Sequence, residues 1–432
     1  MGNFFGIFGV IAILGVAFLM SRDKKAINWA LVAKGLTLQL IIALFILKFP
    51  PGKAFFAFVG NLIKHLLAFA DKGGEFVFGV LVNKPEVFNE LFGDGSGFIF
   101  AFKIVPTIIF VAVLVNIAYH IGLMQRIVSF VAKIVYKLMK VSGSEALSNV
   151  ASAFVGQVEA QILIKPYVAG MTRSELLASM TGSMACIAGG VMAVYISLGV
   201  PAEYLLAASL MAVPGGLVIS KMVYPETNQS ETMGEIKLEV KKTHANLIDA
   251  MAHGASEGMR ISINVIAMLV GFLAVIAMID AILGYTGRGL AVVAAQIGFS
   301  GIDFASLSLN KILGSIFSVF AWLMGVPGSD AFTVGSLMGT KMAINEFVAY
   351  MNLAPIIHGT SDIVLSPKSI VIASFALCGF ANFGSIAVQV GGIGEIAPNR
   401  RSDLAKLGIR ALICGTLASY LSATIAGILS SF

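Results

Sequence analysis

Long apolar stretches recur along the whole 432-residue chain and limit its fold more than any other feature. Charged residues make up 12% of the chain, against about 25% in a typical soluble domain. A helix of about 20 apolar residues spans a bilayer. Eight stretches approach or exceed that length: Phe4–Met20, Trp29–Leu47, Phe98–Leu123, Leu176–Val200, Leu205–Val223, Ile261–Leu283, Ser369–Ile393 and Leu407–Leu429. The sequence therefore predicts an all-α integral membrane protein with about eight transmembrane helices.

Basic residues between these stretches predict which loops face the cytoplasm. One cluster contains Arg22, Lys24 and Lys25, and another contains Arg126, Lys133, Lys137 and Lys140. The first cluster follows the first apolar stretch, whereas a signal peptide has the reverse order. We expect a multi-pass protein of the cell inner (plasma) membrane, with both termini on the outer (periplasmic) side. The amphipathic stretch Pro51–Asp71 is expected to be an interfacial helix, and Pro225–Asn246 is expected to be a loop.

Several other classes of protein lack support in the sequence. Cys186, Cys378 and Cys414 lie singly in apolar tracts, without the spacing of a zinc site or a disulfide framework. The five histidines form no metal-binding motif. No nucleophile motif or phosphate-binding loop indicates an enzyme. The net charge of +6 reflects basic loops, so no nucleic-acid partner is expected. We therefore expect no catalytic residues, no cofactor and no metal.

Polar side chains lie deep in two apolar tracts, where a lipid-facing helix could not carry them. In the first tract, Gln157 and Glu159 follow Gly156, with basic residues before and after the tract. Both ends of Ala146–Tyr167 are therefore expected on the cytoplasmic side, and the segment is too short to cross twice. These features favour a re-entrant hairpin with its tip in a cavity. The alternative is an ordinary helix kinked at the glycine.

The second tract, Ile312–Tyr350, repeats this design. Gly325-Val326-Pro327-Gly328 interrupts it, and Asp330, Asn345 and Glu346 follow. Each predicted hairpin precedes a helix with a weak middle, at residues 185–190 and 379–385. Hairpin, broken helix and span thus occur once in each half, which predicts an inverted repeat. This is transporter architecture, with the binding site between the repeats.

Two groups of motifs carry a family resemblance. The first group comprises Gly156-Gln157-Val158-Glu159, followed by Lys165-Pro166-Tyr167, and Ile187–Gly190. The second group comprises Gly325-Val326-Pro327, Asn345–Tyr350 and Phe375–Ile386. The first group resembles the first hairpin and fourth helix of the concentrative nucleoside transporter family, and the second group resembles its second hairpin and seventh helix, as in a bacterial member. The resemblance runs almost end to end.

The resemblance implies a homotrimer that imports a nucleoside such as uridine or adenosine. In each chain a transport domain is expected to move against the trimeric scaffold, which is called an elevator-type movement. Residues 1–142 are expected to hold scaffold helices and the interfacial helix. Residues 143–225 are expected to hold the first hairpin and the following helices of the transport domain. Residues 226–305 are expected to hold a cytoplasmic loop, a scaffold helix and a connector, and residues 306–432 the second hairpin and the last two helices.

The resemblance also implies a substrate site. Gln157, Val158 and Glu159 are expected on the base side, Asp330, Asn382 and Ser385 on the ribose side, Phe380 as an apolar wall and Val191 as a further contact. The chemistry agrees, since a carboxylate accepts two hydroxyl donors at once and an amide both donates and accepts. The chain departs from the family at Val158, where Ser or Thr is usual, and at Asp330, where Glu is usual.

The coupling-ion site implied by the resemblance departs further. It comprises Ser152, Val155, Cys186 and Ile187, where the family has Asn and Ser in place of Ser152 and Cys186. Sodium prefers oxygen ligands, and a thiol is a poor substitute. We therefore favour H+ over Na+ as the coupling cation. Apolar surroundings favour a neutral carboxyl group, so the candidate proton carriers are Glu159, Asp330 and Glu346. The alternatives are a sodium-coupled symporter with a weakened ion site and an uncoupled facilitator.

Overall fold

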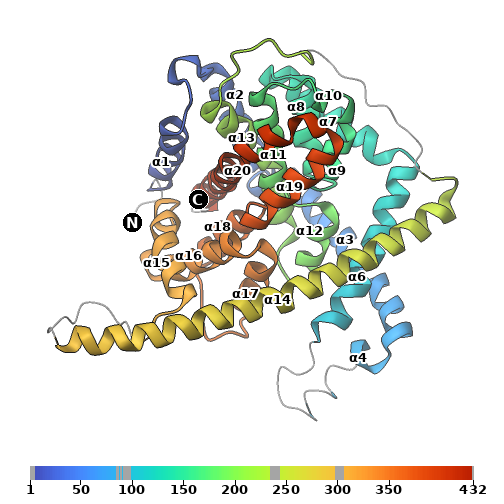
Figure 1. Ribbon diagram of the computed structural model, residues 1–432. Helices are drawn as coiled ribbons and strands as arrows, with labels where there is room; N and C mark the ends of the chain where they lie inside the picture. Colours follow the sequence, from blue (N-terminus) through green and yellow to red (C-terminus); the bar gives the residue numbers. More distant parts are fainter. Residues whose placement is uncertain are drawn as a thin grey trace.

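The computed structural model describes residues 5–83, 99–233, 244–296 and 306–430, together with residues 87 and 90, and every element in these ranges is helical (Figure 1). The first half contains α1 (Phe5–Leu19), η1 (Lys24–Ala26), α2 (Trp29–Leu47), α3 (Pro50–Phe78), α4 (Val80–Asn83), α6 (Phe100–His120), α7 (Leu123–Met139), α8 (Gly143–Ser152), α9 (Glu159–Leu163), α10 (Lys165–Val168), α11 (Arg173–Ala185), α12 (Gly189–Ser197) and α13 (Ala202–Val223). The second half contains α14 (Leu247–Gln296), α15 (Leu309–Leu323), α16 (Gly328–Ala343), α17 (Glu346–His358), α18 (Pro367–Leu377), α19 (Phe383–Ile396), η3 (Pro398–Arg400) and α20 (Arg401–Ser430).

The all-α membrane architecture predicted from the sequence is confirmed. Among the described residues, seven helical segments are long and apolar enough to cross a membrane, or eight when the bent pair α15 and α16 counts as one. The predicted first span corresponds to α1, which has only 15 residues and is shorter than a span. The stretch Pro51–Asp71, expected as an interfacial helix, is part of the 29-residue α3, whose length and composition also suit a span. The predicted loop Pro225–Asn246 contains no helix at residues 225–233 and 244–246, and residues 234–243 lie outside the described ranges.

The 50-residue helix α14 lies along the outside of the molecule and packs against α6 (Figure 1). Two glycines allow this close approach. A Cβ at Gly254 would lie 2.7 Å from Val113 Cα, and one at Gly258 would lie 2.6 Å from Ile109 Cα. Farther along α14, large apolar side chains such as Val270 and Met278 are exposed. This helix therefore presents an apolar face to the surroundings of the molecule.

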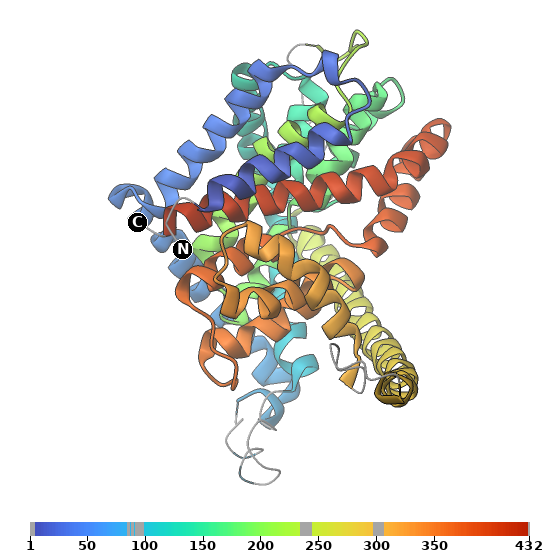
Figure 2. The ribbon, with the colours of Figure 1, turned by 90° about the vertical axis from the view of Figure 1, so that its left-hand side faces the viewer.

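The helices α11, α13 and α20 form the buried centre of the molecule, and α1 and α2 pack against α13 and α20. Figure 2 shows α1 and α20 running side by side. The end of α15 meets α1 through a glycine contact, since a Cβ at Gly9 would lie 2.3 Å from Leu323 O. The first two helices therefore belong structurally with the C-terminal helices, although they are far apart in the sequence.

Four helix interruptions lie where the sequence predicted weak segments. The chain breaks between α8 and α9, between α11 and α12, between α15 and α16, and between α18 and α19. Gly156, Gly325 and Gly379 have positive φ values of 131°, 98° and 138°, which side chains strongly disfavour. The α15–α16 pair is bent by 120°. Glycine thus sets the positions of three of these four interruptions.

Candidate functional site

The two broken helices touch at their breaks. The backbone N–H of Phe380 donates to Cys186 O at 3.2 Å, so the α18–α19 break lies on the α11–α12 break. A Cβ at Gly379 would lie 2.7 Å from Ala185 O, too close for any side chain. The break between α8 and α9 joins the same place, because Gly189 N donates to Phe154 O at 3.0 Å. Three interrupted segments, far apart in sequence, therefore meet at one point.

A carboxylate and an amide face each other beside this crossing. Asn382 is the N-cap of α19, where its Oδ1 accepts from Ser385 N at 2.9 Å. Its Nδ2 donates to Glu346 Oε2 at 3.3 Å, and the Tyr195 hydroxyl donates to Glu346 Oε1 at 3.0 Å. Glu346 and Asn382 are 5% and 6% exposed. These groups form a polar cluster buried inside an apolar bundle.

Glu346 is held in place by its own helix. It is the first residue of α17, directly after the N-cap Asn345, whose Oδ1 accepts from Val348 N at 3.0 Å. The positive end of the helix dipole stabilises an anion at this position. The start of α17 therefore fixes the position of this carboxylate beside Asn382.

Asp330, by contrast, is engaged at the other end of α18. Its carboxylate accepts from Ser329 Oγ at 2.8 Å, Ser366 N at 3.0 Å and Ser369 Oγ at 2.6 Å. Ser366 is the N-cap of α18. The 11 residues of α18 separate this end from the α18–α19 break by about 15 Å at 1.5 Å per residue. The structure thus brings Glu346, and not Asp330, to Asn382.

The base-side residues lie at the break between α8 and α9. Gln157 is half-buried, and its Oε1 is buried without a hydrogen-bond partner. A buried acceptor without a donor is costly, so this oxygen suits a ligand that donates. The Glu159 carboxylate folds back over Gly156, whose Cβ would lie 2.5 Å from Glu159 Oε2. Val158 packs on α19, since a Cβ at Gly392 would lie 2.8 Å from its Cγ1.

Three further residues expected in the substrate site lie on the elements that cross. Phe380 belongs to the break itself and is half-buried. Val191, in the first turn of α12, is half-buried as well, and Ser385 in the first turn of α19 is buried. The structure thus places these residues on the same two broken helices that meet at Cys186 and Phe380.

The residues expected to hold a coupling ion are largely engaged with protein partners. Ser152 Oγ donates to Ser148 O at 2.8 Å and lies 2.9 Å from Ser183 Oγ. Cys186 is fully buried, and its thiol lies 3.8 Å from Ser209 O. Its carbonyl accepts from Phe380 N. Val155 is half-buried, whereas Ile187 is fully buried.

Sequence reasoning missed a buried polar network beside these residues. Ser148 and Ser179 are 2.6 Å apart through their hydroxyls, and Gln161 binds both and also donates to Ser183 Oγ at 2.8 Å. Ser148 pairs with Ser179, and Ser152 with Ser183, each 31 residues apart. Such a repeated spacing is the only sequence signal, and it has meaning only once α8 and α11 are known to pack together.

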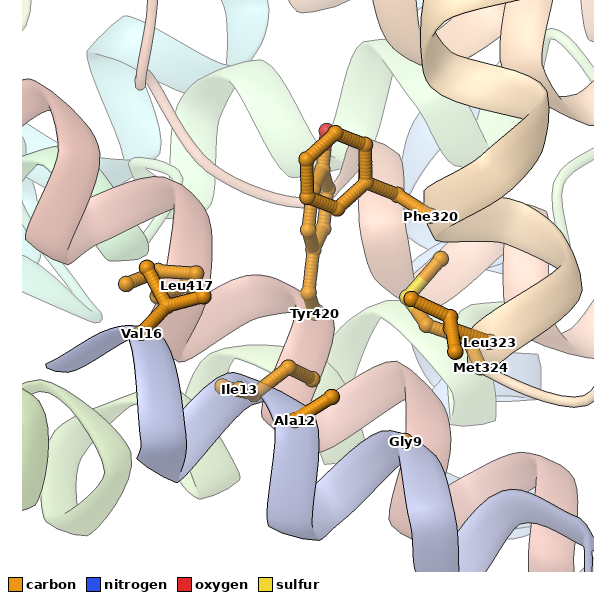
Figure 3. Close-up of a pocket in the computed structure, with 9 residues that line it drawn as sticks. All are labelled: Gly9, Ala12, Ile13, Val16, Phe320, Leu323, Met324, Leu417 and Tyr420. Atoms are coloured by element: carbon orange, nitrogen blue, oxygen red, sulfur yellow. The ribbon is translucent and has the colours of Figure 1, made fainter. Parts of the chain in front are cut away.

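The pocket drawn in Figure 3 lies elsewhere, between α1, the end of α15 and α20. Apolar side chains line it, and the rings of Phe320 and Tyr420 lie 6.4 Å apart beside it. The Tyr420 hydroxyl is the single side-chain polar group in this lining. A nucleoside needs several polar partners, so this pocket does not suit it.

Interrupted helices that cross at a buried polar cluster, inside a bundle of membrane-spanning helices, define a membrane transporter. A family model described as Na+ dependent nucleoside transporter C-terminus matches residues 204–427, and the corresponding N-terminus model matches residues 8–81. A third model, described as nucleoside recognition, matches residues 101–202. The chain belongs to the concentrative nucleoside transporter family.

Known relatives match along nearly the whole chain. The chain is 41% identical to the putative nucleoside permease NupX of Escherichia coli, over 98% of this chain and 97% of that protein. It is 35% identical to sodium/nucleoside cotransporter 1 of Mus musculus, over 98% of this chain and 63% of that protein. Its fold matches the structure of CNTnw in an inward-facing substrate-bound state with a TM-score of 0.90 and 40% identity, over 99% and 98% of the two chains. The chain is therefore a nucleoside transporter and not an enzyme.

Proposed function

We propose that this protein is a secondary-active nucleoside importer that binds the ribose at the crossing of its two broken helices. The observation that carries the proposal is the contact between Asn382 Nδ2 and Glu346 Oε2, buried beside that crossing. A ribose offers two neighbouring hydroxyl groups. A carboxylate accepts from both, while the amide accepts from or donates to the ring substituents.

We propose Glu346 as the ribose-binding acid, instead of Asp330, which the resemblance suggested. Asp330 already accepts three hydrogen bonds at the start of α18, so its oxygens are committed to the fold. Glu346 accepts two, from Tyr195 and Asn382, and a carboxylate has about four acceptor positions, so two remain for ligand hydroxyl groups. Ser385, in the first turn of α19, is proposed as a further ribose contact.

The base side is proposed to consist of Gln157 and Glu159, with Phe380 and Val191 as apolar walls. Gln157 Oε1 has no partner within the protein, which supports a ligand donor there. Val158 is packed on Gly392, so we assign it a packing role at the edge of the site.

Replacing Gln157 by Ala is expected to change the ranking among nucleosides. The amide meets only the base, so uridine and adenosine should lose affinity by different factors, at least about threefold apart. Isothermal titration of the purified protein with both nucleosides measures this. Ser385→Ala is the matched comparison, because loss of a ribose contact weakens both nucleosides equally. An equal loss for both nucleosides in Gln157→Ala contradicts the assignment.

We further propose elevator-type movement within a homotrimer. The scaffold would contain α3, α6, α7 and α14, and the exposed apolar face of α14 supports contact with lipid or with a neighbouring subunit. The transport domain would contain both hairpins, here proposed as re-entrant, and the two broken helices. Because α1 and α2 pack on α13 and α20, we propose to group them with the transport domain.

The coupling cation is proposed to be H+. Ser152 Oγ is engaged with Ser148 O and Ser183 Oγ. Cys186 offers only a thiol, which contacts Ser209 O. Few oxygens are therefore left for sodium. The family model and the mammalian relatives are named for sodium, so sodium coupling is the second candidate.

Uridine uptake into proteoliposomes tests this proposal. An inward proton gradient without sodium should accumulate uridine above the outside concentration, whereas an inward sodium gradient at fixed pH should not. Accumulation under the sodium gradient alone would establish the second candidate. Equilibration without accumulation under either gradient would mean an uncoupled facilitator.

A further inference from the structure

A lysine side chain is buried in the last turn of α16, where the sequence analysis assigned no role. Lys341 is 1% exposed, and its Nζ donates to Ala376 O at 2.8 Å. A charged amine inside a membrane-spanning bundle is expensive unless polar groups surround it. Its neighbours therefore indicate what it does.

Lys341 caps the C-terminal end of α18 by donating to one of its last carbonyl groups. The last carbonyl groups of a helix have no partner inside the helix, and they carry the negative end of its dipole. Two of them are satisfied from outside, Ala376 O by Lys341 and Ser374 O by the Tyr350 hydroxyl at 2.7 Å. The chain leaves α18 immediately afterwards, at Cys378, and reaches Asn382 four residues later. Lys341 thus supports the backbone that presents Asn382.

Lys341 also acts on the carboxylate that faces Asn382. The positive charge of Lys341 and the negative charge of Glu346 attract each other within the buried cluster. The other ionisable groups around Glu346 are Tyr195, which donates to it, and Tyr350 and Cys378. None of these three groups carries a positive charge. Among the residues that the structure describes, Lys341 is therefore the cation of this cluster.

We propose that Lys341 is a positioning residue for ribose recognition. It fixes the carbonyl end of α18 and attracts the Glu346 carboxylate, so that Glu346 and Asn382 face the ribose hydroxyl groups together. This inference rests on the proposed role of Glu346 and Asn382. A lysine with only a packing role would affect the binding of all ligands equally. A positioning role for Lys341 predicts a larger effect on ligands that carry the ribose hydroxyl groups.

The test compares uridine with 2′,3′-dideoxyuridine, which lacks the two neighbouring 2′ and 3′ hydroxyl groups of the ribose. Binding of each ligand to the full-length protein is measured for wild type, Lys341→Met, Glu346→Gln and the double variant. In Lys341→Met, uridine should bind at least about tenfold more weakly while dideoxyuridine changes by less than about threefold. In the Glu346→Gln background, adding Lys341→Met should cause less than about a threefold further loss.

Lys368→Met is the matched control, because Lys368 lies at the opposite end of α18 and is partly exposed. It should bind both ligands as wild type does. Unfolding temperatures without ligand report whether each variant folds. If Lys341→Met does not fold, Lys341→Arg and Lys341→Gln replace it. The arginine, which keeps the charge, should retain the discrimination, and the glutamine, which keeps only a donor, should lose it.

Equal losses for both ligands in Lys341→Met, or full additivity with Glu346→Gln, would overturn the positioning role. Wild-type affinity for uridine in Lys341→Met would overturn it as well. Failure of the proposed function itself looks different. In that case wild type does not discriminate between the two ligands, or Glu346→Gln binds uridine normally.

Discussion

Replacing Glu346 by Gln is expected to weaken uridine binding by about tenfold or more, since a hydrogen bond to a charged group contributes about 1.5–3 kcal/mol. The substitution keeps the size of the side chain but removes an acceptor and the charge. Tyr195 and Asn382 lose the anion to which they now donate. The measurement is a uridine titration of the purified transporter. Uptake in proteoliposomes should fall in parallel.

Asp330→Asn is the matched control for this experiment, because it makes the same change at the acid that the sequence suggested first. Uridine affinity should stay within about threefold of wild type. The unfolding temperature should fall instead, because Asp330 accepts from Ser366 N and Ser369 Oγ at the start of α18. The reverse pattern, with binding lost in Asp330→Asn and kept in Glu346→Gln, would identify Asp330 as the ribose-binding acid.

Glu346 and Asp330 show what could not be predicted from the sequence. Glycine and proline made the helix breaks predictable, since glycine accepts positive φ angles and proline lacks a backbone N–H donor. Asp330 follows the Gly325–Gly328 break by two residues, and the resemblance suggested it as the ribose-binding acid. The structure fills that position with Ser366 and Ser369 from a helix 36 or more residues away. Glu346 begins a separate helix, α17, that the sequence analysis had merged into the hairpin. Asn345 before Glu346 is the N-cap signal that could have separated the two.

The roles of buried polar residues that belong to no motif could not be predicted for a different reason. Lys341 and the serines of α8 and α11 have functions only through partners from other helices. Helix ends were also uncertain. The predicted span Ile261–Leu283 lies within α14, which runs from Leu247 to Gln296 because no proline interrupts it. Local sequence therefore predicts where helices break, while packing decides which polar groups meet.

Restoring the ion-site residues usual in the family is expected to make transport respond to sodium. Ser152→Asn adds a carbonyl oxygen, and Cys186→Ser replaces a soft thiol by a hydroxyl group. Both positions are buried next to the backbone of the two breaks that touch through Phe380 N and Cys186 O. An inward sodium gradient should then stimulate uridine accumulation by at least about tenfold over wild type, because the added oxygen ligands strengthen the sodium site.

Cys414→Ser is the matched control, because Cys414 is also a fully buried thiol but lies on α20, and its uptake should remain insensitive to sodium. Thermal stabilisation of the double variant by sodium chloride, against choline chloride, tests ion binding without transport. A site rebuilt by these two oxygens should show stabilisation by sodium that wild type lacks. Sodium-driven accumulation already present in the wild-type protein would contradict the proposal, because it would mean that backbone carbonyl groups and Ser152 hold the ion without either substitution.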